Sequence, residues 1–165
     1  TGVSDVCSSD LGVFQDNRLV LGHIGDSRCY RLRGQELAQL TKDHSLLQEQ
    51  IDAGLMTPEQ AQTSQNRNLI TRALGVDDEV LMEIGEHRVE PGDTYLMCSD
   101  GLSDMVEDED LAVILRDTRI SMEQKKLALI EAAKVGGGRD NISVLLVKVT
   151  QASSRRGLLS RMLRK

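Results

Sequence analysis

Three aspartates that could bind a cation lie at sharp turns beside apolar stretches. Asp100 follows the apolar run Tyr95–Cys98, and Gly101 after it allows the backbone to turn. Two further turns, each also containing a glycine, hold Asp26 and Asp140. One strand that ends in Asp-Gly is most often only a turn. Three such carboxylates that converge from separate strand ends would make an oxygen-only site, which suits Mg²⁺ or Mn²⁺.

Other chemistries lack their characteristic residues. The cysteines show no metal-ligand spacing, and His23, His44 and His87 are scattered, which argues against zinc. We expect these histidines to be structural or exposed. The glycines at 136–138 lack the Lys-Ser/Thr of a P-loop, and no Gly-x-Ser-x-Gly elbow occurs. Metal-activated hydrolysis is the best chemical interpretation of the three aspartates, and purely structural turns are the alternative.

Short apolar or alternating runs bounded by turn residues predict an antiparallel meander in the first part of the chain. These runs are residues 13–15, 18–24, 27–33 and 36–40. From Ser45 the apolar spacing becomes helical, and Thr57-Pro58 has the composition of a second helix start. We expect residues 44–75 to form a helical excursion over the sheet, a candidate flap.

The second part of the chain returns to strands and then to a pair of helices. Strands are predicted at residues 80–84, 86–89 and 94–98. Helices are predicted to begin near Glu107 and Ser121. The second helix has an apolar face made of Leu127, Ile130 and Ala133. The nearly continuous apolar run 142–149 predicts a central strand covered on both faces. This order of elements indicates antiparallel sheets covered by helix pairs, the α+β class.

Composition narrows the partners. The net charge is −6, although residues 152–165 hold five basic residues and no acid, so the body of the chain is acidic. The chain has one Phe, two Tyr and no Trp, so few aromatic side chains could stack on nucleic-acid bases. Together with the acidic body, this argues against a nucleic-acid partner. With no apolar run of membrane-spanning length and no signal peptide, we expect a cytoplasmic protein with Cys29 and Cys98 as reduced core thiols.

The two ends of the chain differ from its body. Residues 1–11 have no strand or helix period and read like a translated sequencing adapter, so we expect them to lie outside the fold, with a disordered N-terminus as the alternative. The domain is then expected at residues 12–150. Residues 151–165 form a basic tail, for which a solvated C-terminus is expected over weak membrane contact.

Six short motifs occur in the order and spacing of a known family. They are Gly25-Asp-Ser-Arg28, Leu40-Thr-Lys-Asp-His-Ser45, Arg72-Ala-Leu-Gly75, Pro91-Gly-Asp93, Cys98-Ser-Asp-Gly-Leu102 and Gly138-Arg-Asp-Asn-Ile-Ser143. Together they resemble the bacterial metal-dependent serine/threonine phosphatases of type 2C, the PPM family, over about residues 13–150. The resemblance implies a β-sandwich of two antiparallel sheets flanked by helix pairs.

The resemblance also implies roles for the turn residues. Asp100 and Asp140 would be catalytic ligands of a binuclear Mn²⁺ or Mg²⁺ centre, and Asp26 would join Asp100 at a third, looser ion. The supporting residues would be Ser99, Gly101, Asn141 and Arg28. Asn141 would orient the loop that carries Asp140. Arg28 is expected to pair with a nearby carboxylate and not to bind the substrate.

By the same resemblance, the protein would hydrolyse phosphoserine and phosphothreonine in proteins, as a monomer that opposes a bacterial Ser/Thr kinase. The family has further metal ligands, a phosphate-binding Arg and a His upstream of the Gly25–Arg28 segment, and they have no counterpart here. We therefore expect about half of a metal site, missing N-terminal strands, and weak or no activity. The alternative is a non-catalytic type 2C-like domain that binds a phosphoprotein or a regulatory partner.

Overall fold

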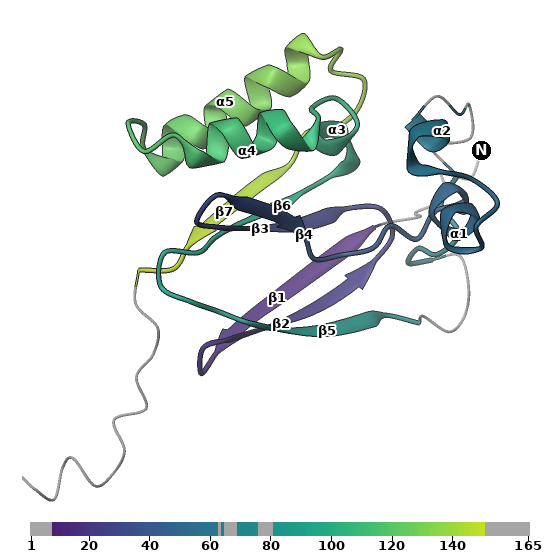
Figure 1. Ribbon diagram of the computed structural model, residues 1–165, viewed down its shortest axis with the longest axis horizontal. Coiled ribbons are helices and arrows are strands. Elements are labelled where there is room, and N and C mark those ends of the chain that lie inside the picture. The colour runs from purple at the N-terminus through teal and green to yellow at the C-terminus, as the bar shows by residue number, and fades with distance from the viewer. Residues whose placement is uncertain (1–7, 63, 65–68, 76–80, 151–165) are drawn as a thin grey trace, which may run out of the picture.

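The computed structural model describes residues 8–62, 64, 69–75 and 81–150 as two antiparallel sheets with helices (Figure 1). One sheet has the strand order β1-β2-β5 and the other the order β4-β3-β6-β7. The strands are β1 Ser9–Gln15, β2 Arg18–Ile24, β3 Arg28–Arg33, β4 Glu36–Gln39, β5 Glu83–Arg88, β6 Thr94–Cys98 and β7 Val144–Lys148. The predicted α+β class with two antiparallel sheets is confirmed.

The helices form two groups. They are α1 Leu46–Asp52, α2 Pro58–Gln62, α3 Asp100–Ser103, α4 Asp108–Arg116 and α5 Met122–Val135. The pair α4 and α5 covers the outer face of the four-stranded sheet, whereas α1 and α2 lie beyond one end of the sandwich (Figure 1). The predicted caps are present, because Ser45 Oγ accepts from Gln48 N, and Ser121 forms a capping box with Gln124.

Alternation along β3 and β6 places side chains in two separate cores. Cys29 and Tyr95 face the three-stranded sheet, where they pack with Leu19 and Leu21 of β2. On the opposite face, Tyr30, Leu32 and Leu96 pack against helix residues that include Leu102, Leu111, Leu115 and Leu129. Each fully buried leucine contributes roughly 1.5–3 kcal/mol to folding. Since β6 lies between β3 and β7, its end is held rigidly where Asp100 begins.

Three strand predictions need correction. The run 142–149 was predicted to be a central strand, but β7 is at the edge of its sheet within the part of the chain that the structure describes. The apolar residues of this run pack in both cores: Val144 and Leu146 pack against the helix-covered core, and Val147 and Val149 pack in the core between the sheets.

The second correction concerns residues 80–89, which were predicted to form two strands. A single strand, β5, runs through Gly85 from Glu83 to Arg88. The third concerns the N-terminal segment 1–11. Strand β1 starts at Ser9 and pairs with β2 from that residue on, so the strand extends into the segment that we expected outside the fold. The foreign origin of residues 1–11 stays a prediction.

The predicted apolar face of α5 was correct at Ala133 and wrong at Leu127. Leu129 and Ala133 are fully buried on that helix, whereas Leu127 is 56% exposed. Lys125 is buried with them, and its Nζ donates a hydrogen bond to Leu115 O at the end of α4. This amine satisfies a carbonyl at the C-terminal turn of α4, a group that has no partner within its own helix.

The outer face of the three-stranded sheet carries exposed aliphatic side chains. Leu11 is 62%, Val13 48% and Ile84 71% exposed. No described helix covers this face (Figure 1). Cys29 and Cys98 are buried free thiols, as predicted. Within the described ranges, no helix is long and apolar enough to cross a membrane. The basic tail, residues 151–165, lies outside them.

Candidate active site

Asp100 is the first residue of the short helix α3, which begins two residues after β6 ends at Cys98. Ser99 is the N-cap of α3, and the amide of Gly101 donates to Asp100 Oδ1 at 2.8 Å. Burial and the negative charge of Asp26 raise the pKa of Asp100 above its usual value, and Asp140 and Asp104 act in the same direction. The hydrogen bond from Gly101 opposes them. Asp100 therefore sits in a field of like charge, which a cation would relieve.

The loop that carries Asp140 is tied to the end of β6. The amide of Asn141 donates to Asp140 Oδ1 at 2.6 Å. Ser99 Oγ donates to Asn141 O at 2.7 Å and accepts from Ser143 N at 3.0 Å. A Cβ on Gly101 would lie 2.4 Å from Asn141 O, so only glycine permits this approach. The predicted supporting residues thus hold the loop of Asp140 against the turn of Asp100.

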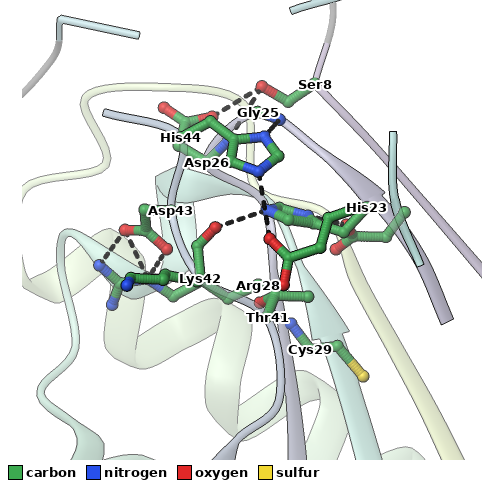
Figure 2. Close-up of polar contacts among 12 residues, drawn as sticks. Ser8, His23, Gly25, Asp26, Arg28, Cys29, Thr41, Lys42, Asp43 and His44 are labelled. Carbon is green, nitrogen blue, oxygen red and sulfur yellow. Dashed lines mark hydrogen bonds and ion pairs between the residues drawn. The ribbon is translucent and has the colours of Figure 1, made fainter. Parts of the chain in front are cut away.

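Asp26 follows Gly25, whose φ of 104° favours glycine. Ser8 Oγ donates to Asp26 Oδ1 at 2.7 Å and accepts from the Asp26 amide at 3.3 Å (Figure 2). A Cβ on Gly25 would lie 2.1 Å from Ser8 Oγ, so the chain crosses closely at this point. These contacts fix the orientation of the Asp26 carboxylate.

The guanidinium group of Arg28 is bound by the carboxylate of Asp43 (Figure 2). Its Nη2 lies 2.6 Å from Asp43 Oδ2, its Nε lies 3.0 Å from both carboxylate oxygens, and its Nη1 donates to Tyr30 Oη at 3.2 Å. Burial alone would lower the pKa of Arg28, but the bonds to Asp43 raise it. The pairing with a nearby carboxylate that we predicted for Arg28 is therefore present.

The two buried histidines are structural, and their rings lie 4.7 Å apart. His23 contacts Asp10 Oδ1 at 2.5 Å and Lys42 O at 2.9 Å. Burial lowers the pKa of His23, but the hydrogen bond and charge of Asp10, the bond to Lys42 O and the charge of Glu83 together raise it. Burial and the charge of His23 lower the pKa of His44, whose Nδ1 accepts from the Gly25 amide at 3.1 Å. His44 thus supports the turn before Asp26.

Whether these residues suit a divalent cation depends on donor type and on grouping. Asp26, Asp100 and Asp140 offer only carboxylate oxygens, the donors that Mg²⁺ and Mn²⁺ prefer. Their charges act together on the pKa of Asp100. However, no group of three or more His, Cys, Asp or Glu residues is arranged to hold a metal ion among the residues described. The donors still fit such a cation by their chemistry.

Further acidic residues that the sequence interpretation missed line the same site. A pocket of about 310 Å³ is lined by Asp26 and Asp100, and also by Asp43, Asp104, Glu107 and Asp108. Asp104 lies one helical turn after Asp100, a spacing that places both on one side of α3. That signal was available, but the Ser99–Gly101 stretch was interpreted as a turn and not as a helix start.

Comparison with known proteins places the chain among bacterial phosphatases. No model of a known protein family matches it. It is 40% identical over 136 residues to protein phosphatase PhpP of Streptococcus pneumoniae, which covers 82% of this chain and 55% of PhpP. It is 46% identical over 138 residues to serine/threonine protein phosphatase PstP of Mycobacterium tuberculosis, which covers 83% of this chain and 26% of PstP. The chain thus spans about half of PhpP and about a quarter of PstP.

Solved structures agree with these relatives. The chain resembles the crystal structure of the M. tuberculosis phosphatase PstP/Ppp with a TM-score of 0.82 at 42% identity, over 87% of this chain and 60% of that one. A crystal structure of the PstP catalytic domain in complex with two manganese ions gives a TM-score of 0.78 at 41% identity, over 88% and 60% of the two chains.

Proposed function

Because the chain belongs to the bacterial type 2C (PPM) family of serine/threonine phosphatases, we propose that the protein hydrolyses phosphoserine and phosphothreonine in other proteins. The observation that carries this proposal is that Ser99 and Gly101 hold the loop of Asp140 against the turn of Asp100, where the like charges of Asp26 and Asp140, together with burial, raise the pKa of Asp100. Clustered like charges at a strand end mark a functional site, because they cost stability unless a ligand relieves them.

The cofactor that we propose is Mn²⁺ or Mg²⁺, held by Asp100 and Asp140 in a binuclear centre, with Asp26 and Asp100 at a third ion. A bound cation would lower the pKa of water and offset the charge of a phosphoryl group. The protein groups do the positioning, since Gly101 N orients Asp100 and Asn141 N orients Asp140. With Arg28 paired to Asp43, the described pocket repels a phosphate until cations neutralise it.

We further propose that this chain alone is weakly active or inactive, and that the sandwich of the whole protein contains more strands. The absence of any three-residue metal group among the described residues supports an incomplete ligand set. The exposed aliphatic face of the β1-β2-β5 sheet supports missing structure on that side. A cytoplasmic, monomeric protein that opposes a Ser/Thr kinase and binds no nucleic acid completes the proposal.

A second candidate function is favoured by the same incomplete site. A type 2C-like domain that binds a phosphoprotein or a regulatory partner without catalysis needs no complete set of metal ligands. Such a domain does not need like-charged aspartates near one another, however, and Asp26, Asp100 and Asp140 are all present. Catalysis is therefore the better supported of the two.

Hydrolysis of a phosphothreonine peptide by the purified chain in Mn²⁺ tests the proposal, with Asp100→Asn and Asp140→Asn measured beside it. Low activity that both substitutions abolish is the expected result. Activity that survives both substitutions would show that the site lies elsewhere. If a folded chain is silent, the same assay on a protein extended to the length of PhpP decides, and silence there would favour the binding domain.

A further inference from the structure

The pocket next to Asp100 extends away from the three predicted ligands and opens between two structural units. One wall is formed by the excursion that holds α1 and α2, and the other by α3 and the start of α4. Its volume of about 310 Å³ is at the lower end of the range for pockets that take small ligands or single side chains. The residues of this part of the pocket are not among the three predicted ligands, so we consider which ligand group their chemistry suits.

The two walls have opposite character. The excursion contributes aliphatic groups, which are Leu47, Ile51, Pro58 and Ala61. The α3–α4 side contributes carboxylates, which are Asp104, Glu107 and Asp108. A ligand group that suits both walls is amphipathic, with an apolar stem and a charged or polar end.

The charges that line the pocket determine whether the polar end of the ligand group should be positive or negative. The pocket contains one basic side chain, Arg28, which Asp43 already binds with both carboxylate oxygens. Glu107 and Asp108 form no ion pair with any residue that the structure describes, and Glu107, the N-cap residue of α4, makes no capping hydrogen bond through its side chain. These two carboxylates are available to a cationic group from outside the chain.

A third feature of the pocket is an unsatisfied hydroxyl. Ser103 lines it, and Ser103 Oγ is buried without a hydrogen-bond partner among the described residues. A buried hydroxyl without a partner costs free energy, which a donor group entering the pocket would recover. An apolar guest would leave this hydroxyl and the carboxylates unpaired, and an anionic guest would be repelled.

We propose that this pocket is a subsite for a lysine or arginine side chain of the phosphoprotein substrate, close in sequence to the phosphorylated residue. The aliphatic stem would lie on Leu47 and Ile51, and the cationic end would pair with Glu107 and Asp108. This inference rests on the proposed function, since it assigns part of that substrate. It makes the α1–α2 excursion and the start of α4 the elements that select among phosphoproteins.

Binding measured without hydrolysis tests the subsite separately from catalysis. The probes are fluorescent phosphothreonine peptides in which one lysine is moved through the flanking positions, each matched by a peptide with norleucine, which keeps the apolar stem and removes the charge. Fluorescence anisotropy with the 165-residue chain in Mn²⁺ gives Kd for each pair. At one or two positions, lysine is expected to bind about 5–20-fold more tightly than norleucine, and added salt is expected to reduce the difference.

A matched pair of variants locates the effect. Glu107→Gln with Asp108→Asn removes two charges that line the pocket, and Glu109→Gln with Asp110→Asn removes two from the same first turn of α4 that do not line it. The first variant is expected to bind the lysine and norleucine peptides equally. The second is expected to keep the preference, although both lose similar helix-dipole stabilisation.

Three outcomes would overturn the proposal: equal Kd for lysine and norleucine peptides at every position, an equal loss of preference in both double variants, or a preference for acidic peptides. The first needs no variant, so a misfolded mutant cannot hide it. Lysine preference in a protein that never hydrolyses the peptides would remove the proposed catalysis and keep the subsite. Hydrolysis with the same KM for the lysine and norleucine peptides would remove the proposed subsite and keep the proposed catalysis.

Discussion

Strand β6 has an aspartate at each end, and the two carboxyl groups meet opposite surroundings. Asp93, just before the strand, is 1% exposed and accepts hydrogen bonds from Arg33 Nε and Nη2, both at 2.8 Å. Burial raises the pKa of Asp93, but the bonds from Arg33 outweigh it and the pKa is lowered. For Asp100, burial and neighbouring carboxylates act together to raise the pKa.

The opposite pKa shifts mean that the two carboxylates have opposite effects on the stability of the fold. An acid with a lowered pKa stabilises the folded state above its unfolded pKa, and this contribution is lost as the pH falls through the folded value. An acid with a raised pKa has the opposite effect: it destabilises the fold increasingly as the pH rises from the unfolded pKa to the folded pKa, and fully above that. The carboxylate at one end of β6 is therefore neutralised by Arg33, whereas the carboxylate at the other end lies among like charges.

The largest effect is expected for Asp93→Asn. It leaves Arg33 without its buried carboxylate, so we expect a loss of about 2–3 kcal/mol in the free energy of unfolding at pH 7, measured by urea denaturation. The control is Glu90→Gln, since Glu90 Oε1 lies 3.1 Å from Arg33 Nη1 and this side chain is 42% exposed. That pair should contribute less than about 1 kcal/mol. Equal losses would mean that burial at Asp93 does not matter.

A divalent cation should stabilise only the Asp100 end. At ten times its Kd, Mn²⁺ is expected to add about 1.4 kcal/mol, or roughly 3–5 °C in Tm, to the wild-type chain. Differential scanning fluorimetry should show the same shift in Asp93→Asn and little or none in Asp100→Asn. A full shift in Asp100→Asn would place the cation elsewhere.

The hydrogen bonds of Ser99 that connect the end of β6 to the Asp140 loop are expected to contribute somewhat less to the free energy of unfolding. Ser99→Ala removes the two hydrogen bonds to Asn141 O and Ser143 N, which should cost about 1 kcal/mol and weaken Mn²⁺ binding by a few-fold. Ser103→Ala is the matched control, because that hydroxyl has no partner among the described residues. Urea denaturation of both variants measures the difference. A similar loss from both would show that Ser99 does not act through these bonds.

The smallest change, and the one of opposite sign, is Asp100→Asn without metal. It removes a like charge, so stability should rise by up to ~1 kcal/mol at pH 7–8, after allowance for solvent screening. Since the pKa of Asp100 is raised from 3.8, the gain should vanish in thermal melts below about pH 4. A variant that is less stable than the wild type at pH 8 would refute the repulsion inferred between these carboxylates.

Local signals were sufficient for most elements. The caps at Ser45 and Ser121 and the strand that ends at Cys98 follow from side-chain chemistry within a few residues. The partner of Asp93 could not be found in this way, because Arg33 is 60 residues away and its pairing depends on the register of β3 and β6. The sequence thus placed Asp93 in a motif without revealing that it is the paired end of the strand.

Other errors have physical causes. The apolar run at β7 indicates that side chains on both faces of the strand are packed in a core. Such a pattern does not distinguish a central strand from an edge strand. Helix α3 was missed because Gly101 disfavours a helix, whereas Asn141 O occupies the space of a Cβ there and requires glycine. The acidic wall at Glu107 and Asp108 was interpreted only as the start of a helix, since its proximity to the α1–α2 excursion is a tertiary property.

The edge position of β7 has a consequence for synthesis on the ribosome. This strand begins 46 residues after β6 ends, and β6 pairs only with β3 until it arrives. At translation rates of about 5–20 residues per second, one side of β6 waits roughly 2–9 s for its partner. During that interval the open backbone of β6 and the apolar face of Leu96 are exposed, so this strand is where a nascent chain would most need a chaperone.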